Sequence, residues 1–423
     1  MLRITSFAKL TATLLFVSVT AFTLMAQVPE NDQVSKNYLS TARHQSGKVP
    51  PNNRSSQGSP HDPLFFDSVA NFSGQFNANG FDSFNNIAKK WDFNMVGNRP
   101  EHGGTTVINA PIIPVSIDLR NADGSPRFVN GIRMISDATQ FVQPVLDSPV
   151  FSNANYSSSS VPTQFTDAIQ RAEFFDTATP DWHTLLKPVV KPARTMTLLK
   201  GTYLFATNDD GTCCAFILVD EGTFINSFLP LFGSNPGSVV ATAENAGDIT
   251  THDISTFLFP NTFLFLQGDL SFFTVGFHTV DFESGNSANG NLEKVFVINY
   301  SSWVSPFVFF GDNFQDVTAI SHELAETFND PFVGADGDHG ITPWWLAPNG
   351  GCQNLMEVGD VVEDLPNATF PIAINGVVYH PQNESLLPWF EFQSPSHAID
   401  GAYSYPDESL LPSLSPVQHA FCE

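Results

Sequence analysis

Residues 316–331 decide the fold: Asp316-Val317-Thr318-Ala319-Ile320-Ser321-His322-Glu323-Leu324-Ala325-Glu326-Thr327-Phe328-Asn329-Asp330-Pro331. At about 100° per residue, four apolar side chains of this stretch fall in one narrow stripe that should pack on the core of a helix-containing fold. They are Val317, Ile320, Leu324 and Phe328. Asp312 and Asn313 are the expected N-caps, Asp316 suits the positive end of the helix dipole, and Pro331 ends the helix.

The opposite side of this helix carries candidate catalytic chemistry. His322 and Glu326, one turn apart, share that side, and Glu323 lies next to them. An imidazole and a carboxylate in this relation can bind one metal ion, while Glu323 points at a water molecule on that ion. This is the arrangement of the His-Glu-x-x-His zinc hydrolases, with Glu326 in place of the second histidine. Zinc is the expected ion, although the added carboxylate makes other divalent cations more competitive.

A plainer interpretation of the same helix is open. A polar face with one histidine and two glutamates commonly faces water and binds nothing, and short motifs often arise by chance. A metal hydrolase also needs a third protein ligand and one open position. We expect Glu357 to be that ligand and Asp360 to be its support or substitute. Asp330 is a weaker candidate, because an acid before proline is more often a turn residue.

The beginning of the chain predicts export. Residues 1–26 contain Arg3 and Lys9, then an apolar run, then Ala26 before a polar residue, which is typical of a cleaved secretory signal peptide. Residues 27–62 are polar and predict a flexible leader. No later stretch is suited to cross a membrane as a helix, so we expect a secreted or periplasmic protein.

The charge balance limits the partners. Acids outnumber bases 43 to 18, which gives a net charge of −25. Nucleic acids and anionic lipids are bound by basic surfaces, so neither is an expected partner.

The remaining chain divides into two regions. Residues 63–310 predict a β-rich α+β region, and residues 311–423 predict the metal-site helix followed by loops. Strands are predicted at Thr105–Leu119, Phe128–Ile135, Thr195–Thr207, Cys214–Val219, Thr223–Phe232, Phe263–Gln267, Phe272–Val280 and Val295–Tyr300. A second helix is predicted from Phe165 to Phe175, and Asn375-Gly376 predicts a hairpin turn.

Four cysteines are present, and an even number in an exported protein is compatible with two disulfides. Cys213 and Cys214 are adjacent, and we expect strain to prevent a bond between them. Each would then pair with Cys352 or Cys422; the alternative is four free thiols. Three histidines outside the helix, His252, His278 and His380, are expected to be ordinary surface or core residues.

Taken together, several motifs resemble a known family. Ser321–Glu326, followed by Asn329-Asp330-Pro331 and then by Glu357-Val358-Gly359-Asp360, is similar to secreted bacterial metallopeptidase-like proteins of the His-Glu-x-x-Glu kind. It also resembles the plant phosphate-induced (Exordium) extracellular proteins, and Gly276-Phe277-His278-Thr279 is a further shared landmark. The resemblance implies an exported zincin-like fold. It does not settle activity, because the plant members are discussed as cell-wall growth proteins.

These patterns favour an exported metal-dependent hydrolase, specifically a peptidase with a peptide or protein substrate. His322, Glu326 and Glu357 would hold the ion, and Glu323 would be the general base. The alternative from another class is a non-catalytic extracellular binding or adhesion protein, in which the same residues hold a structural ion or none.

Overall fold

The computed structural model describes most of the chain between residues 31 and 414. The described residues are 31–41, 43–44, 66–77, 90–231, 233–266, 268–306, 308, 314–333, 347–348 and 355–414. The predicted signal peptide, together with Asp312, Asn313, Cys352 and Cys422, lies outside them. Both strands and helices are present, which confirms the α+β class.

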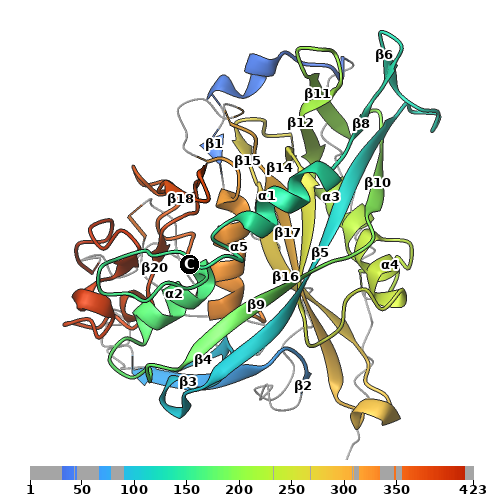
Figure 1. Ribbon diagram of the computed structural model, residues 1–423. Helices are drawn as coiled ribbons and strands as arrows, with labels where there is room; N and C mark the ends of the chain where they lie inside the picture. The colour runs from blue at the N-terminus through green and yellow to red at the C-terminus, as the bar shows by residue number, and fades with distance from the viewer. Residues whose placement is uncertain are drawn as a thin grey trace, which may run out of the picture.

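One mixed sheet of eight strands forms the centre of the molecule (Figure 1). Its main path runs β10 (Arg194–Leu199), β5 (Thr105–Arg120), β13 (Ile254–Pro260), β17 (Glu293–Trp303) and β16 (Gly276–Glu283). Off this path, β9 (His183–Val190) and β8 (Ile135–Ser136) pair with β5, and β2 (Phe66–Asp67) pairs with β17. The strands of the path are parallel to their neighbours except β16, which runs antiparallel to β17. The apolar strand β13 is buried along its whole length, as expected for a parallel strand covered on both faces.

Shorter strands form smaller sheets. One has three strands, β11 (Tyr203–Thr207), β12 (Cys213–Asp220) and β14 (Thr262–Phe265). The two-stranded pairs are β1 (Arg43–His44) with β15 (Phe272–Phe273), β3 (Asn71–Asn77) with β4 (Lys90–Val96), β6 (Phe128–Val129) with β7 (Ile132–Arg133), β18 (Ile372–Ile374) with β19 (Val377–Tyr379), and β20 (Glu384–Ser385) with β21 (Ser404–Tyr405). The β18–β19 pair confirms the predicted hairpin. The strand predicted at 195–207 is divided by a turn into β10 and β11.

Helices cover the sheets and connect them. The α-helices are α1 (Val142–Asp147), α2 (Phe165–Glu173), α3 (Glu221–Phe228), α4 (Val239–Asn245), α5 (Thr318–Asn329) and α6 (Leu387–Phe390). Short 3-10 helices are η1 (Lys36–Thr41), η3 (Pro100–His102), η4 (Thr139–Phe141), η5 (Ser287–Asn289) and η6 (Ile399–Gly401). In the described part of the chain, no helix combines the length and the apolar character needed to span a bilayer.

Helix α5 lies in the middle of the molecule, between the large sheet and the C-terminal segments (Figure 1). It contacts β16, β17, β4 and α2. The predicted apolar stripe is confirmed, because its four side chains belong to one core cluster and are at most 2% exposed.

The predicted start of this helix is wrong. Helix α5 begins at Thr318 after the N-cap residue Val317, and the predicted caps Asp312 and Asn313 lie outside the described residues. Asp316 has a left-handed backbone with φ 45°, which cannot continue a helix. Its carboxylate instead accepts the backbone N–H of His380 at 2.8 Å and lies 2.7 Å from the His380 Nδ1. His380, expected to be an ordinary surface or core residue, is thus half-buried and paired with Asp316.

The segment 223–232, predicted as a strand, contains most of helix α3. Asp220 caps this helix by accepting a backbone N–H of the first turn at 3.0 Å. Phe224 and Phe228, one turn apart, then share the buried face of the helix. Both rings enter an aromatic cluster with residues of β13, β16 and β17. These partners are Phe257, Phe259, Phe277 and Tyr300. Tertiary packing thus selects a helix where local propensity favoured a strand.

The leader predicted to be flexible belongs in part to the fold. Asp32 is buried, and its Oδ1 lies 2.7 Å from the Arg127 Nη2. The backbone N–H of Val34 donates to the Phe205 carbonyl at 2.9 Å, and the Leu39 side chain is fully buried. A buried apolar side chain and a paired carboxylate offset the entropy of ordering residues 31–41.

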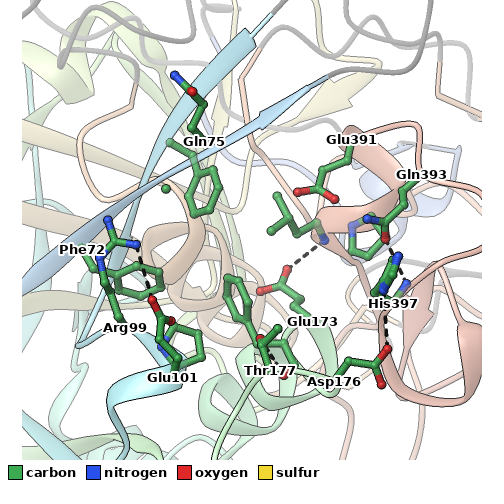
Figure 2. Close-up of a pocket in the computed structure, with 16 residues that line it drawn as sticks. Phe72, Gln75, Arg99, Glu101, Glu173, Asp176, Thr177, Glu391, Gln393 and His397 are labelled. Carbon is green, nitrogen blue, oxygen red and sulfur yellow. Dashed lines mark hydrogen bonds and ion pairs between the residues drawn. The ribbon is translucent and has the colours of Figure 1, made fainter.

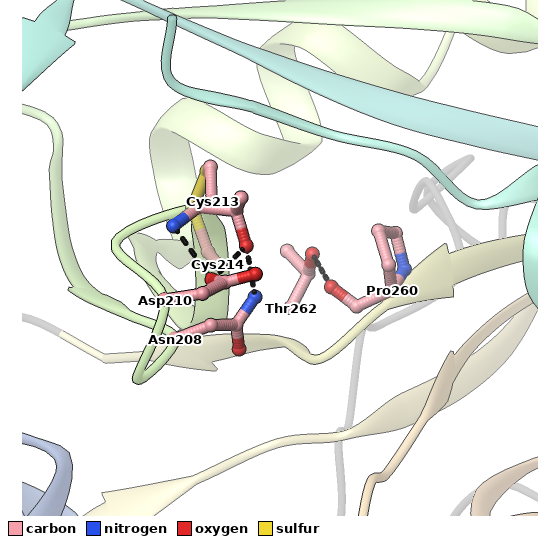
Figure 3. Close-up of a disulfide and its surroundings, with 7 residues drawn as sticks. Asn208, Asp210, Cys213, Cys214, Pro260 and Thr262 are labelled. Carbon is pink, nitrogen blue, oxygen red and sulfur yellow. Dashed lines mark hydrogen bonds between the residues drawn. A yellow bond between two sulfur atoms is a disulfide. The ribbon is translucent and has the colours of Figure 1, made fainter. Parts of the chain in front are cut away.

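The predicted disulfide pairing is wrong for the two adjacent cysteines. Cys213 and Cys214, at the start of β12, form a disulfide with each other (Figure 3). The peptide between these residues is cis, and their Cα atoms are 3.0 Å apart.

The aromatic cluster gives a test of the fold. Phe228→Ala should lower the free energy of unfolding by about 3–5 kcal/mol, because it leaves a cavity among packed rings. Leu199→Ala, at an exposed position of β10, is the matched control and should change it by less than about 0.5 kcal/mol. Urea unfolding followed by circular dichroism measures both, and equal effects would contradict the placement of Phe228 in the core.

Candidate metal centre

The polar face of α5 is buried. His322 and Glu323 are 4% exposed and Glu326 is 3% exposed. The interpretation in which this face lies in water is therefore wrong. Strand β16 and the C-terminal segment cover the face, and they bring further titratable side chains to it. Those side chains are His278, Glu357, Asp360, Glu363 and Glu384, all buried.

Three of the predicted residues lie close to His322. The His322 Nε2 lies 3.2 Å from the Glu326 Oε1, 3.7 Å from the Asp360 Oδ1 and 3.9 Å from the Glu323 Oε1. Glu326 is fixed in this position because its Oε1 accepts the backbone N–H groups of Gly359 and Asp360 at 3.2 and 3.1 Å. The turn from 358 to 364 thus carries Asp360 to the imidazole.

A second group forms around His278, which we expected to be an ordinary histidine. Its Nδ1 lies 3.5 Å from the Glu323 Oε2, 3.5 Å from the Glu326 Oε2 and 3.6 Å from the Glu357 Oε2. Its Nε2 lies 3.3 Å from the carbonyl oxygen of Asp330. Because a carbonyl only accepts, Nε2 carries a hydrogen and Nδ1 faces the three carboxylates. A backbone carbonyl on the second ring nitrogen is the usual support of a metal-ligating histidine.

Glu357 is therefore in the cluster, but beside His278 and not beside His322. Asp330 contacts His278 of this centre through its backbone carbonyl oxygen. Among the described acids outside the helix, Asp360, expected as a support or substitute for Glu357, lies 3.7 Å from the His322 Nε2. His252 is remote from this centre, with its Nδ1 3.0 Å from the carbonyl oxygen of Ser68.

One signal in the sequence pointed to His278. Gly276 and His278 share one face of β16. Phe277, between them, points to the opposite face and enters the aromatic cluster. A Cβ atom at Gly276 would lie 2.5 Å from the Glu323 Oε1, so a larger residue there would force the Glu323 side chain to move. Glycine two residues before a histidine on a strand was the available cue.

Sequence reasoning missed Glu384. This residue of β20 is 0% exposed, and among the described residues neither carboxylate oxygen has a hydrogen-bond partner. Its charge acts on His322, Glu326 and Glu323. The strand is held to the turn 358–364 because the Ser385 backbone N–H donates to the Val358 carbonyl at 2.9 Å. A lone acid in a turn-rich segment gives no periodic signal.

The cluster buries more acidic than basic side chains. Burial by itself lowers the pKa of His322, but the charges of Glu326 and Glu323 outweigh it and raise that pKa well above its ordinary value. Burial raises the pKa of Glu357 and of Glu384 well above the ordinary range, and the nearby histidines offset this only in part. For Glu326 burial also acts upward, yet His322 and His278 outweigh it and lower the pKa. No lysine or arginine is among the buried side chains of the described residues. Protons or bound cations must therefore compensate these carboxylates.

The cluster contains two groups whose ligand atoms could hold a metal ion. They are His278 with Glu323 and Glu326, and His322 with Asp360 and Glu363. Within each group the candidate atoms lie within 4.8 Å of one another, which suits ligands that share an ion at about 2.0–2.6 Å. Among the described residues, the Glu384 oxygens and the His322 Nδ1 have no hydrogen-bond partner, which agrees with a site that needs a cation. Mixed imidazole and carboxylate ligands suit zinc and several other divalent ions.

No protein-family model, curated protein or solved structure matches the chain, so the interpretation of this site depends on its own geometry.

Gly359 gives a test of how tightly the centre is packed. A Cβ atom there would lie 2.4 Å from the His322 Nδ1 and 2.9 Å from the Glu384 Oε2. Gly359→Ala should therefore lower the free energy of unfolding by about 1–3 kcal/mol, measured by urea unfolding. Gly237→Ala is the control, because its added carbon would meet only the Asn235 Oδ1, at 3.7 Å. A variant at 359 as stable as the control would show that the turn does not approach His322 this closely.

Proposed function

We propose that this protein is an exported metal-dependent hydrolase with a zincin-like fold, acting on peptides or proteins. The observation that carries the proposal is the burial of two imidazoles and several carboxylates in one cluster, although they come from distant parts of the chain. Charged groups are buried together in this way where a cation compensates them. Export is supported by the signal-peptide pattern at 1–26.

The zincin-like fold is supported by the order of the elements. A β-rich region precedes α5, and a looser region with short strands and turns supplies the remaining acids. This is also the arrangement implied by the resemblance to the His-Glu-x-x-Glu proteins and to the plant phosphate-induced proteins.

We assign His322, Glu326 and Asp360 as the residues that would hold the ion, with zinc as the expected metal. Glu326 belongs to the group around His278, but its Oε1 lies 3.2 Å from the His322 Nε2, so it borders both groups. Asp360 is preferred to Glu357 because it lies 3.7 Å from the His322 Nε2, whereas Glu357 lies beside His278. Glu357 and Glu363 are the remaining carboxylates of the same cluster. A metal ion in such a site polarises a substrate carbonyl and lowers the pKa of bound water.

Glu323 is then the general base. Its Oε1 is 3.9 Å from the His322 Nε2, and its Oε2 is 3.5 Å from the His278 Nδ1, so it lies between the two imidazoles. It would accept a proton from the attacking water and deliver that proton to the leaving amine. His278, held by the Asp330 carbonyl, positions the Glu323 carboxylate for both transfers.

The low solvent exposure of the metal centre favours a second function. The helix ligands are at most 4% exposed, as are the nearest acids Asp360 and Glu384. A structural ion in a non-catalytic extracellular binding or adhesion protein would be enclosed in this way.

The general base can be tested by Glu323→Gln. The variant should keep its bound metal and lose at least about 100-fold in the rate of peptide cleavage, because Gln cannot accept the proton. A peptide-library digestion read by mass spectrometry measures the rate, and elemental analysis measures the metal. Glu408→Gln, outside the cluster, is the control for substitution of an acid. Cleavage at the parental rate would exclude Glu323 as the base, and a metal-loaded parent without any cleavage would favour the structural ion.

Removal of the metal tests the assumption that both proposed functions share, namely that the centre holds an ion. A chelator should lower the Tm of the parent by several degrees, because an ion at about 1,000 times its Kd contributes roughly 4 kcal/mol to stability. His322→Gln should have a lower Tm before treatment and should not respond to the chelator. A parent that purifies without metal, and whose Tm ignores both chelator and added zinc, would exclude a metal centre.

A further inference from the structure

A cavity of about 460 Å³ lies apart from the metal cluster, where the β3–β4 hairpin, the end of α2 and helix α6 meet (Figure 2). It shares no lining residue with the cluster. Its walls include six apolar side chains, Phe72, Phe93, Pro100, Phe174, Leu387 and Pro388. The volume is in the range of small-molecule sites, about 300–1,000 Å³.

Glu173 is the last residue of α2, and its side chain reaches into this cavity (Figure 2). The side chain is 3% exposed, and its Oε1 accepts the backbone N–H of Leu387 at 3.1 Å. Its Oε2 has no hydrogen-bond partner among the described residues. A carboxylate at the C-terminal end of a helix also opposes the helix dipole. Fold stability therefore does not explain an acid at this position.

A second carboxylate faces the same space. Glu391 follows α6 and lines the cavity, and Figure 2 shows it turned toward the middle together with Glu173. Burial raises the pKa of Glu391 to about 7. For Glu173 burial raises the pKa well above its ordinary value, and the charge of Glu391 raises it further.

The basic side chains of the lining have partners of their own. The Arg99 guanidinium donates to the Ser73 carbonyl at 2.5 Å and lies 3.7 Å from the Glu101 carboxylate. The His397 Nδ1 lies 3.5 Å from the Asp176 Oδ2. Neither group is paired with Glu173 or Glu391 in the described residues. The cavity thus has apolar walls, and two carboxyl groups without a basic partner among the described residues lie together at one place.

We propose that this cavity binds an organic cation, an ammonium or guanidinium group on an apolar stem. The charged group would donate to the free Oε2 of Glu173 and to Glu391, while the stem packs on Phe72, Phe93 and Phe174. Aromatic faces also attract cations directly. A metal ion fits less well, because aromatic and proline walls supply no oxygen ligands. The source of the cation is either a free amine or a lysine or arginine side chain of a peptide.

The proposal is independent of the proposed hydrolase activity, and calorimetry on the full chain can test it. The probes are n-butylamine and N-acetyl-lysine amide, with n-butanol and N-acetyl-norleucine amide as neutral partners of similar shape. We expect each cation to bind at least tenfold more tightly than its neutral partner. The stronger binder of the two cations identifies the source, and chelation of metal should leave both affinities unchanged.

Variants connect this binding to the cavity. Glu173→Gln keeps the side-chain volume and should weaken cation binding by at least tenfold, and Glu391→Gln should weaken it several-fold. Asp176→Asn is the matched control, since Asp176 lines the same cavity but pairs with His397, and its affinity should change less than threefold. Melting curves show whether each variant is folded; if Glu173→Gln is not, Glu391→Gln carries the test. Equal binding of the neutral partners, parental affinity in the Gln variants, or displacement of the amine by Ca²⁺ would overturn the proposal.

Discussion

Covering the charged face of α5 is the constraint on which the rest of the structure depends. The apolar stripe of this helix packs on the large sheet, as any amphipathic helix would. Its other face carries His322, Glu323 and Glu326, which would normally remain in water. Here β16 and the C-terminal segment enclose that face and add still more acids. Such an arrangement is stable only if protons or metal ions compensate the carboxylates. The stability of the fold and the chemistry of the site therefore depend on the same compensation.

Close backbone approach is what makes the enclosure possible. Gly276 lets β16 approach Glu323, and Gly359 lets the turn 358–364 approach the His322 ring. The turn is then fixed from the outside, because the Gln382 side chain donates to the Gly359 carbonyl at 2.8 Å. The C-terminal segment is loop-rich, yet its path is determined by these contacts and by a core that it shares with α2 and β4.

The α5 cluster and the cavity at Glu173 both bury carboxylates that have no lysine or arginine partner among the described residues, and their surroundings differ. The α5 cluster contains imidazoles, so nitrogen and oxygen ligands can share a metal ion. The cavity at Glu173 is walled by aromatic and aliphatic side chains, which suits a cation with an apolar stem. Helix α2 connects the two regions, since it ends at Glu173 and its Gln170 Nε2 donates to the carbonyl of Phe328 in α5 at 3.3 Å.

The sequence by itself determined what depends on local order: helix α5 and its apolar stripe, the hairpin at Asn375-Gly376, the α+β class, and His322 with Glu326 one turn apart. Only the tertiary structure decided that His278 and Glu384 join the cluster, that Asp360 and not Glu357 lies beside His322, and that 221–228 is a helix. The physical reason is that periodicity and turn chemistry act over a few residues, whereas these placements depend on strand register and on packing between segments far apart in the chain.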